Sequence, residues 1–397
     1  MRLTPATELE HRCSRLQELM VVEGVDAVVV VQNADLFYFT GTIQSGSLYI
    51  PVQGQPLYMV QKDFLRARME SGLKEVAPIS SLSDIARISQ QFGYPVPKRI
   101  GLELDIIPVA FFESYRSLFP AAEFINATQM IRHVRMIKSH YEIHLMKDAA
   151  DQLDMVYRRA NEIIRAGITE LELSAELEFT ARTLGHQGLM RIRSFNTEFL
   201  YCRVISGTDS AVPAYAETPL GGMGPNSSFG IGAGLKRIDR DEPIIIDFCG
   251  CVDGYLVNQT RLYAIGCLSD RLRTGYDDML AIQQYMMELV EPGADWGEVY
   301  DRCLARAAQM GYAENFMGAA GSQVSFVGHG VGIEIDEYPV IARSFNSMQF
   351  EVGMVFAFGP KLVFPGEGAV GIENTFFISN DGLKKLNLSS DELVVLP

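Results

Sequence analysis

Apolar residues near the N-terminus recur at helical spacing and then form a continuous run. From Leu9 onward they repeat every three or four positions over a segment that Thr4 caps and Gly24 ends, which predicts an amphipathic helix. The run Val-Asp-Ala-Val-Val-Val-Val over 25–31 predicts a buried strand. Further strands are predicted, with helical stretches between them, over 47–52, 56–60 and 99–104. Helices that alternate with strands predict an α/β domain over residues 1–135.

A second, longer region follows with its own helix signals. Capping boxes start two helices, at Ser139-His-Tyr-Glu142 and at Thr169-Glu-Leu-Glu172. Two more helices are predicted over 270–290 and 296–310. The segment 243–261 reads as a buried strand, a Gly-containing turn and a returning strand. Residues 136–397 are therefore predicted to form an α+β domain.

The composition is that of an ordinary globular protein with room for two domains. The chain has 397 residues, of which 48% are hydrophobic and 21% charged. A formal net charge of −15 would repel nucleic acid and anionic lipid over most of the surface, so neither is expected as a partner. The expected partners are a small-molecule substrate and a second copy of the chain.

Location and redox state follow from equally simple features. No apolar run approaches the ~20 residues that a membrane span needs, and the first residues do not resemble a signal peptide. We therefore expect a cytoplasmic protein. Six cysteines are scattered along the sequence, which is typical of free thiols rather than of a disulfide scaffold.

Two segments of the second region carry the main functional signal. The first runs from Pro243 to Arg261, and the second runs from Gly328-His329-Gly330 to Gly371-Ile-Glu373-Asn-Thr375. They resemble the pita-bread family of creatinase, prolidase, aminopeptidase P and methionine aminopeptidase. The resemblance implies a creatinase-like N-terminal α/β domain followed by a pita-bread domain. It also implies a homodimer in which the N-terminal domain of one chain helps to cover the pocket of the other.

The same resemblance indicates a damaged metal site. In the metallopeptidases of that family, two Asp, one His and two Glu hold two divalent ions. The matching positions here are Asp247, Asn258, His329, Gly359 and Glu373. Glycine offers no side-chain ligand, and asparagine offers a neutral oxygen where a bridging carboxylate would offset the charge of two cations. Three auxiliary histidines of the family are replaced by Ala214, Ser325 and Asp336.

A dinuclear centre is therefore not expected, and no cofactor is predicted. A single divalent ion on Asp247, His329 and Glu373 stays open. The same three residues are the predicted catalytic groups, with His329 either as a general base whose pKa a neighbouring carboxylate raises or as a relic that hydrogen bonds satisfy. The predicted substrate-binding residues are Tyr255, Asn258, Asp336, Glu337 and Arg203.

Carboxylates without metal ions favour a cationic ligand, unless basic side chains of the protein pair with them. The candidates for such pairing are Arg203, Lys236, Arg261 and Arg343. Cys249 and Cys251 share a strand face with Asp247, so they are either reactive groups in the pocket or small buried residues. The Gly-rich loop 217–235 is either a surface insertion or an active-site lid.

Three functions fit this reading. The first is a creatinase-like hydrolase that acts on a C–N bond of a small cationic amidino or amide compound without a dinuclear metal centre. The second is an Xaa-Pro aminopeptidase or dipeptidase that works with a reduced, single-ion site. The third is a non-catalytic ligand-binding protein on the same scaffold.

Overall fold

The computed structural model describes residues 2–345 and 347–397, and the chain divides into two compact units. The first unit is Met1–Arg135 and the second is Met136–Pro397. Each has its own sheets and its own hydrophobic core. Within the described ranges, no helix is long and apolar enough to cross a membrane.

The first unit is built on one six-stranded sheet. Its strands are β1 (Ala27–Val30), β2 (Gly46–Pro51), β3 (Leu57–Val60), β4 (Glu75–Pro78), β5 (Arg99–Leu102) and β6 (Glu123–Asn126). Their order is β4-β3-β2-β1-β5-β6. β2 pairs antiparallel with β1 and β3, whereas the pairs β3–β4, β1–β5 and β5–β6 are parallel. The predicted strands are therefore present, each with its ends shifted by a few residues at most.

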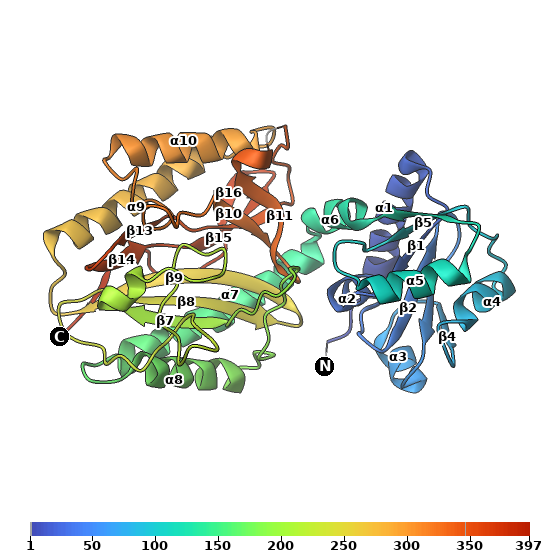
Figure 1. Cartoon of the computed structure of the whole chain (residues 1–397), viewed down its shortest axis with the longest axis horizontal. Helices are drawn as coiled ribbons and strands as arrows, with labels where there is room; N and C mark the ends of the chain where they lie inside the picture. Colours follow the sequence, from blue (N-terminus) through green and yellow to red (C-terminus); the bar gives the residue numbers. More distant parts are fainter. Residues whose placement is uncertain (1, 346) are drawn as a thin grey trace. The chain divides into compact units, whose positions relative to one another are not determined.

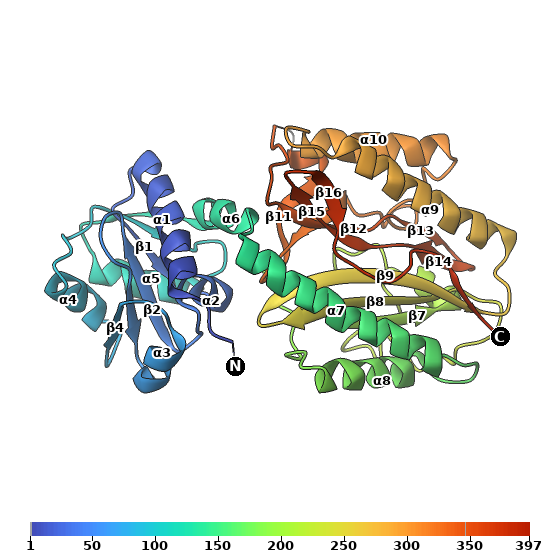
Figure 2. The same cartoon turned by 180° about the vertical axis from the view of Figure 1, so that it is seen from behind.

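Helices cover both faces of this sheet. They are α1 (Ala6–Glu23), α2 (Asn33–Thr40), α3 (Phe64–Glu70), α4 (Asp84–Gln91), α5 (Val109–Leu118) and α6 (Thr128–Met136). Figures 1 and 2 show α1 on one face and α5 on the other, which is the α/β arrangement expected from the sequence. The first helix ends at Gly24, whose φ of 65° suits glycine. Its N-cap is Pro5, so the predicted cap at Thr4 is wrong by one residue.

The second unit contains four α-helices in its described residues. They are α7 (His140–Ile163), α8 (Glu170–Thr183), α9 (Asp270–Leu289) and α10 (Trp296–Gln309), with short 3₁₀ turns η1 (Gly207–Ala211) and η2 (Arg343–Phe345). Both predicted capping boxes are formed, because each Ser or Thr hydroxyl accepts the N3 backbone N–H and each N3 glutamate accepts the N-cap N–H. The helices predicted over 270–290 and 296–310 match α9 and α10.

Strands fill the interior of this unit. They are β7 (Cys202–Ser206), β8 (Ile244–Val252), β9 (Tyr255–Ile265), β10 (Phe326–Val331), β11 (Ile335–Ala342), β12 (Val355–Phe358), β13 (Lys361–Phe364), β14 (Gly368–Gly371), β15 (Asn374–Ser379), β16 (Gly382–Lys385) and β17 (Val394–Leu396). One sheet has the order β17-β9-β8-β7, another β11-β10-β12-β15-β16, and β13 pairs with β14. The α+β arrangement expected from the sequence is therefore confirmed.

The helices of the second unit lie outside these strands. α7 contacts β8 and β9, and α8 contacts β7, whereas α9 contacts β13 and β14, and α10 contacts β11. In Figures 1 and 2 the pair α7 and α8 lies on one side of the strands and the pair α9 and α10 on the other. The two strand groups meet where the backbones of Thr260 and Glu373 hydrogen-bond to each other. This contact brings the two sequence motifs together.

Candidate active site

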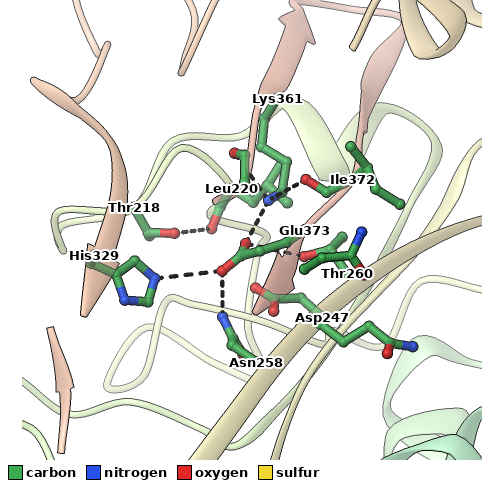
Figure 3. Close-up of polar contacts among 12 residues, drawn as sticks. Thr218, Leu220, Asp247, Asn258, Thr260, His329, Lys361, Ile372 and Glu373 are labelled. Atoms are coloured by element: carbon green, nitrogen blue, oxygen red, sulfur yellow. Dashed lines mark hydrogen bonds and ion pairs between the residues drawn. The ribbon is translucent and has the colours of Figure 1, made fainter. Parts of the chain in front are cut away.

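A pocket in the second unit gathers side chains from both strand groups. Arg203 comes from β7, Asp247 from β8, Asn258 from β9 and His329 from β10, and Glu373 lies immediately before β15. Figure 3 shows His329, Asn258 and Asp247 around the Glu373 carboxylate. The predicted catalytic residues therefore lie in one pocket, although the chain separates Asp247 from Glu373 by more than a hundred residues.

Glu373 is the most heavily hydrogen-bonded group of the pocket. Its Oε1 accepts from Asn258 Nδ2 at 2.5 Å and lies 3.4 Å from His329 Nε2. Its Oε2 accepts from Lys361 Nζ at 2.6 Å and from Thr260 Oγ1 at 3.3 Å. Burial would raise the pKa of Glu373, but Lys361 and His329 outweigh burial and hold that pKa well below its usual range. The carboxylate is therefore ionised and held by four donors from the described chain.

Lys361 was not among the residues that the sequence singled out. Its side chain is 1% exposed, and its ammonium reaches Glu373 Oε2 and the backbone oxygens of Gly359 and Ile372 (Figure 3). A signal for it does exist in the sequence. A lysine that interrupts an apolar segment, here between Phe358 and Leu362, must be paired because a buried ammonium alone is costly.

His329 lies between two carboxylates. Its Nδ1 is 3.3 Å from Asp336 Oδ1, and its Nε2 faces Glu373. Burial lowers the pKa of His329, but Asp336 and Glu373 outweigh it and raise the pKa to about 9. The sequence predicted a raised pKa and a general base. Because the raised pKa keeps the imidazole protonated at neutral pH, His329 is better suited there to donate a proton than to accept one, and its role as a general base stays a prediction.

Asp247 has a different environment. Arg203 Nη1 donates to Asp247 Oδ2 at 3.2 Å and to Thr218 Oγ1 at 3.0 Å. Burial raises the pKa of Asp247, the nearby Glu373 charge adds to this, and Arg203 and Lys361 oppose it. Of the two carboxylates Asp247 and Glu373, Asp247 is therefore the better suited to accept a proton.

These pairs change the expected charge of the pocket. Arg203 faces Asp247 and Lys361 faces Glu373, so the two carboxylates already have basic partners. The expectation that unpaired carboxylates select a cationic ligand is therefore not supported. Of the four basic candidates, Arg203 lines the pocket, whereas Lys236 pairs with Glu242, Arg261 with Asp391 and Arg343 with Asp301.

Two predicted substrate-binding residues lie outside the pocket lining. Tyr255 is buried and its hydroxyl donates to Glu142 Oε1 at 3.0 Å. Glu337 forms a buried ion pair with Lys138 at 2.5 Å. Both side chains instead hold the start of α7 against the strands, and neither lines the pocket. Asn258, Asp336 and Arg203 do line the pocket.

One of the two cysteines and part of the Gly-rich loop line the pocket. Cys249 lines the pocket and Cys251 does not. Burial raises the pKa of the Cys249 thiol well above its ordinary value, so it stays protonated and is a poor nucleophile. The loop contributes Glu217, Thr218, Pro219 and Leu220 to the pocket wall. Part of it therefore belongs to the site, which a surface insertion alone would not explain.

The donor set does not fit a bound metal ion. Among the described residues, no three His, Cys, Asp or Glu side chains are grouped so that they could hold one. Asn258 presents its NH₂ group to Glu373 rather than an oxygen to the pocket, and Lys361 occupies the other side of that carboxylate. A cation would have to displace both donors.

Comparison with known proteins places this site in a family. The profile of metallopeptidase family M24 matches residues 144–380, and that of the creatinase/prolidase N-terminal domain matches residues 12–137. The Xaa-Pro dipeptidase of Pyrococcus horikoshii is 25% identical over 388 residues, covering 97% of this chain and 99% of that protein.

Solved structures agree on the fold. An Xaa-Pro dipeptidase from Bacillus anthracis superposes with a TM-score of 0.82 at 24% identity, covering 98% of this chain and 100% of that one. The X-Pro aminopeptidase from Thermotoga maritima gives a TM-score of 0.80 at 24% identity, covering 97% and 99%. The predicted creatinase-like N-terminal domain and pita-bread domain are confirmed.

Proposed function

Because the chain belongs to metallopeptidase family M24, we propose that it is a hydrolase that cleaves a C–N bond in a small peptide-like molecule without a dinuclear metal centre. The relatives are named Xaa-Pro dipeptidases, so Xaa-Pro dipeptides are the first substrates to test. This favours a dipeptidase-like substrate over the cationic amidino compound that the sequence alone suggested.

One observation carries the proposal. The pocket holds an imidazole and a carboxylate whose pKa values are both raised, and both residues lie within the segment that matches metallopeptidase family M24. An ionised carboxylate and a protonated imidazole that coexist at one pH can divide the roles of base and acid between them. The proposal therefore assigns proton transfer to His329 and Asp247 and gives no role to a pair of metal ions.

The proposed reaction uses these two groups in sequence. Asp247 takes a proton from a water molecule while the oxygen of that water attacks the substrate carbonyl carbon. His329 donates a proton from its imidazolium to the leaving nitrogen as the C–N bond breaks. The products are a carboxylic acid and an amine, and the proton on Asp247 returns to His329 through solvent. Glu373 does not exchange protons in this scheme, because its low pKa keeps it ionised beside His329.

The test is hydrolysis of Xaa-Pro dipeptides by purified protein, with release of proline measured before and after treatment with a strong chelator. We expect turnover that survives chelation and is lost in Asp247→Asn. Asp239→Asn, which changes an exposed aspartate outside the pocket, is the matched control and should keep full activity. The metal content of the same preparation should be measured by elemental analysis.

Each other outcome has a clear meaning. Activity that chelation abolishes and Mn²⁺ restores would establish the single-ion dipeptidase instead. Dipeptide binding without turnover, at equal affinity in the wild type and in Asp247→Asn, would make the chain a binding protein.

A further inference from the structure

The centre of the pocket carries its own positive charge. Two carboxylates, Asp247 and Glu373, face two basic side chains, Arg203 and Lys361, so these four groups are neutral together. The family pattern described above has four carboxylates and two divalent ions, which balance in the same way. We infer that Lys361 takes the place of a metal ion in this fold, and that Lys361, Gly359 and Asn258 act as one matched set.

Hydrogen-bond donors of the protein occupy the oxygen lone pairs of the Glu373 carboxylate, so none is left to bind a cation. Ionised carboxylates accept about four hydrogen bonds, and Glu373 has donors from Lys361, Asn258, Thr260 and His329 within the described chain. An ion would have to remove the two short contacts, those with Lys361 and Asn258. Both contacts are buried, so breaking them leaves the Lys361 ammonium and the Asn258 amide without this acceptor and away from bulk water.

Lys361 acts inside the protein and not on the substrate. An ammonium has three N–H groups, and the structure provides three acceptors, Glu373 Oε2 at 2.6 Å, Gly359 O at 3.2 Å and Ile372 O at 3.3 Å. The side chain is 1% exposed. Lys361 is therefore a positioning residue that fixes Glu373, and through it the Nε2 side of His329.

Gly359 is required by this arrangement. A Cβ added at Gly359 would lie 2.4 Å from Glu373 Oε2 and 2.7 Å from Lys361 Nζ, which is closer than real contacts allow. The space that a longer side chain at 359 would need is filled by the ion pair. Position 359 can therefore carry no metal-binding side chain while Lys361 pairs with Glu373, so the glycine and the lysine depend on each other. This inference concerns the same site but does not depend on the proposed reaction.

The first experiment compares Mn²⁺ binding by calorimetry in three proteins. They are the wild type, the variant Asn258→Asp/Gly359→Glu with Lys361 retained, and the same variant with Lys361→Ala added. We expect binding of about one ion per chain only when Lys361 is removed, with a rise in thermal midpoint on adding Mn²⁺. The inference is overturned if the wild type binds Mn²⁺ equally well, if both variants bind equally, or if the folded triple variant binds none.

A second experiment does not require the multiple variants to fold. Lys361→Ala leaves a space that matches n-propylammonium, so this ion should raise the thermal midpoint of Lys361→Ala and leave the wild type unchanged. The neutral analogue 1-propanol should not do so. Lys236→Ala, which breaks a pair outside the pocket, is the control and should not respond. Equal responses to both additives would overturn the inference. Neither readout involves turnover, so a chain without dipeptidase activity leaves the inference standing.

Discussion

Protonation of His329 should make the stability of the second unit depend on pH. The pKa of His329 rises from 6.5 to about 9 on folding, because Asp336 and Glu373 outweigh the cost of burial. Each pKa unit corresponds to about 1.4 kcal/mol, so the protonated ring stabilises the folded chain by about 3 kcal/mol. A group with a raised folded pKa contributes this stability fully below pH 6.5. The contribution is lost as the pH rises through 9.

The perturbation that isolates this effect is His329→Gln, which retains an N–H donor but cannot titrate. The chain contains one tryptophan, Trp296, and it is fully buried in the core of the second unit. Its fluorescence during urea denaturation therefore reports the unfolding of that unit. Between pH 6.5 and pH 9.5 the free energy of unfolding of the wild type should fall by about 3 kcal/mol more than that of His329→Gln.

The control is His144→Gln, which replaces an exposed histidine of α7 and should follow the wild type. Parallel pH curves for the wild type and His329→Gln would refute the reasoning, because they would mean that the imidazole is not held protonated between its two carboxylates.

The remaining predictions concern the neighbours of this ring. Gly359→Ala should lower the free energy of unfolding by about 1–3 kcal/mol through overpacking, whereas Gly230→Ala, whose added Cβ meets nothing within 4 Å, should change it little; urea denaturation measures both. Arg203→Met should raise the pKa of Asp247 further, so the acid limb of dipeptide hydrolysis should move to higher pH, and an unmoved limb would count against Asp247 as the base. The alkaline limb of the same profile should lie near pH 9 and vanish in His329→Gln, whose residual rate should not depend on pH there.

Helices, strands and the fold class could be predicted from the sequence because their signals, such as capping boxes and apolar periodicity, lie in neighbouring residues or repeat along the chain. The capping boxes at Ser139 and Thr169 fix helix starts with neighbouring residues alone, and both are formed. The resemblance to the pita-bread family implied that Asp247, His329 and Glu373 converge, and the structure places all three in one pocket. These features depend on few contacts, so they can be inferred without coordinates.

The partners of the site residues could not be inferred in the same way. Glu337 follows directly after Asp336 in the sequence, yet it pairs with Lys138, which comes from the start of the domain. Lys361 is the first residue of β13 and forms an ion pair with Glu373. The spacing of apolar residues in the sequence does not predict this contact. Charge balance depends on which side chains face each other, and this is decided by tertiary packing. The homodimer remains a prediction.

The close fit between Gly359 and the Lys361–Glu373 pair also bears on how such a site can change over generations. A side chain gained at position 359 collides with the pair, and loss of the lysine alone leaves a buried carboxylate without its counter-charge. Breaking a buried pair from one side costs about 3–5 kcal/mol, a large fraction of the stability of a typical domain. A single substitution to an acidic residue at 359 is therefore expected to destabilise the fold, although the combined change need not do so. Such epistasis makes the present state hard to leave by one mutation at a time.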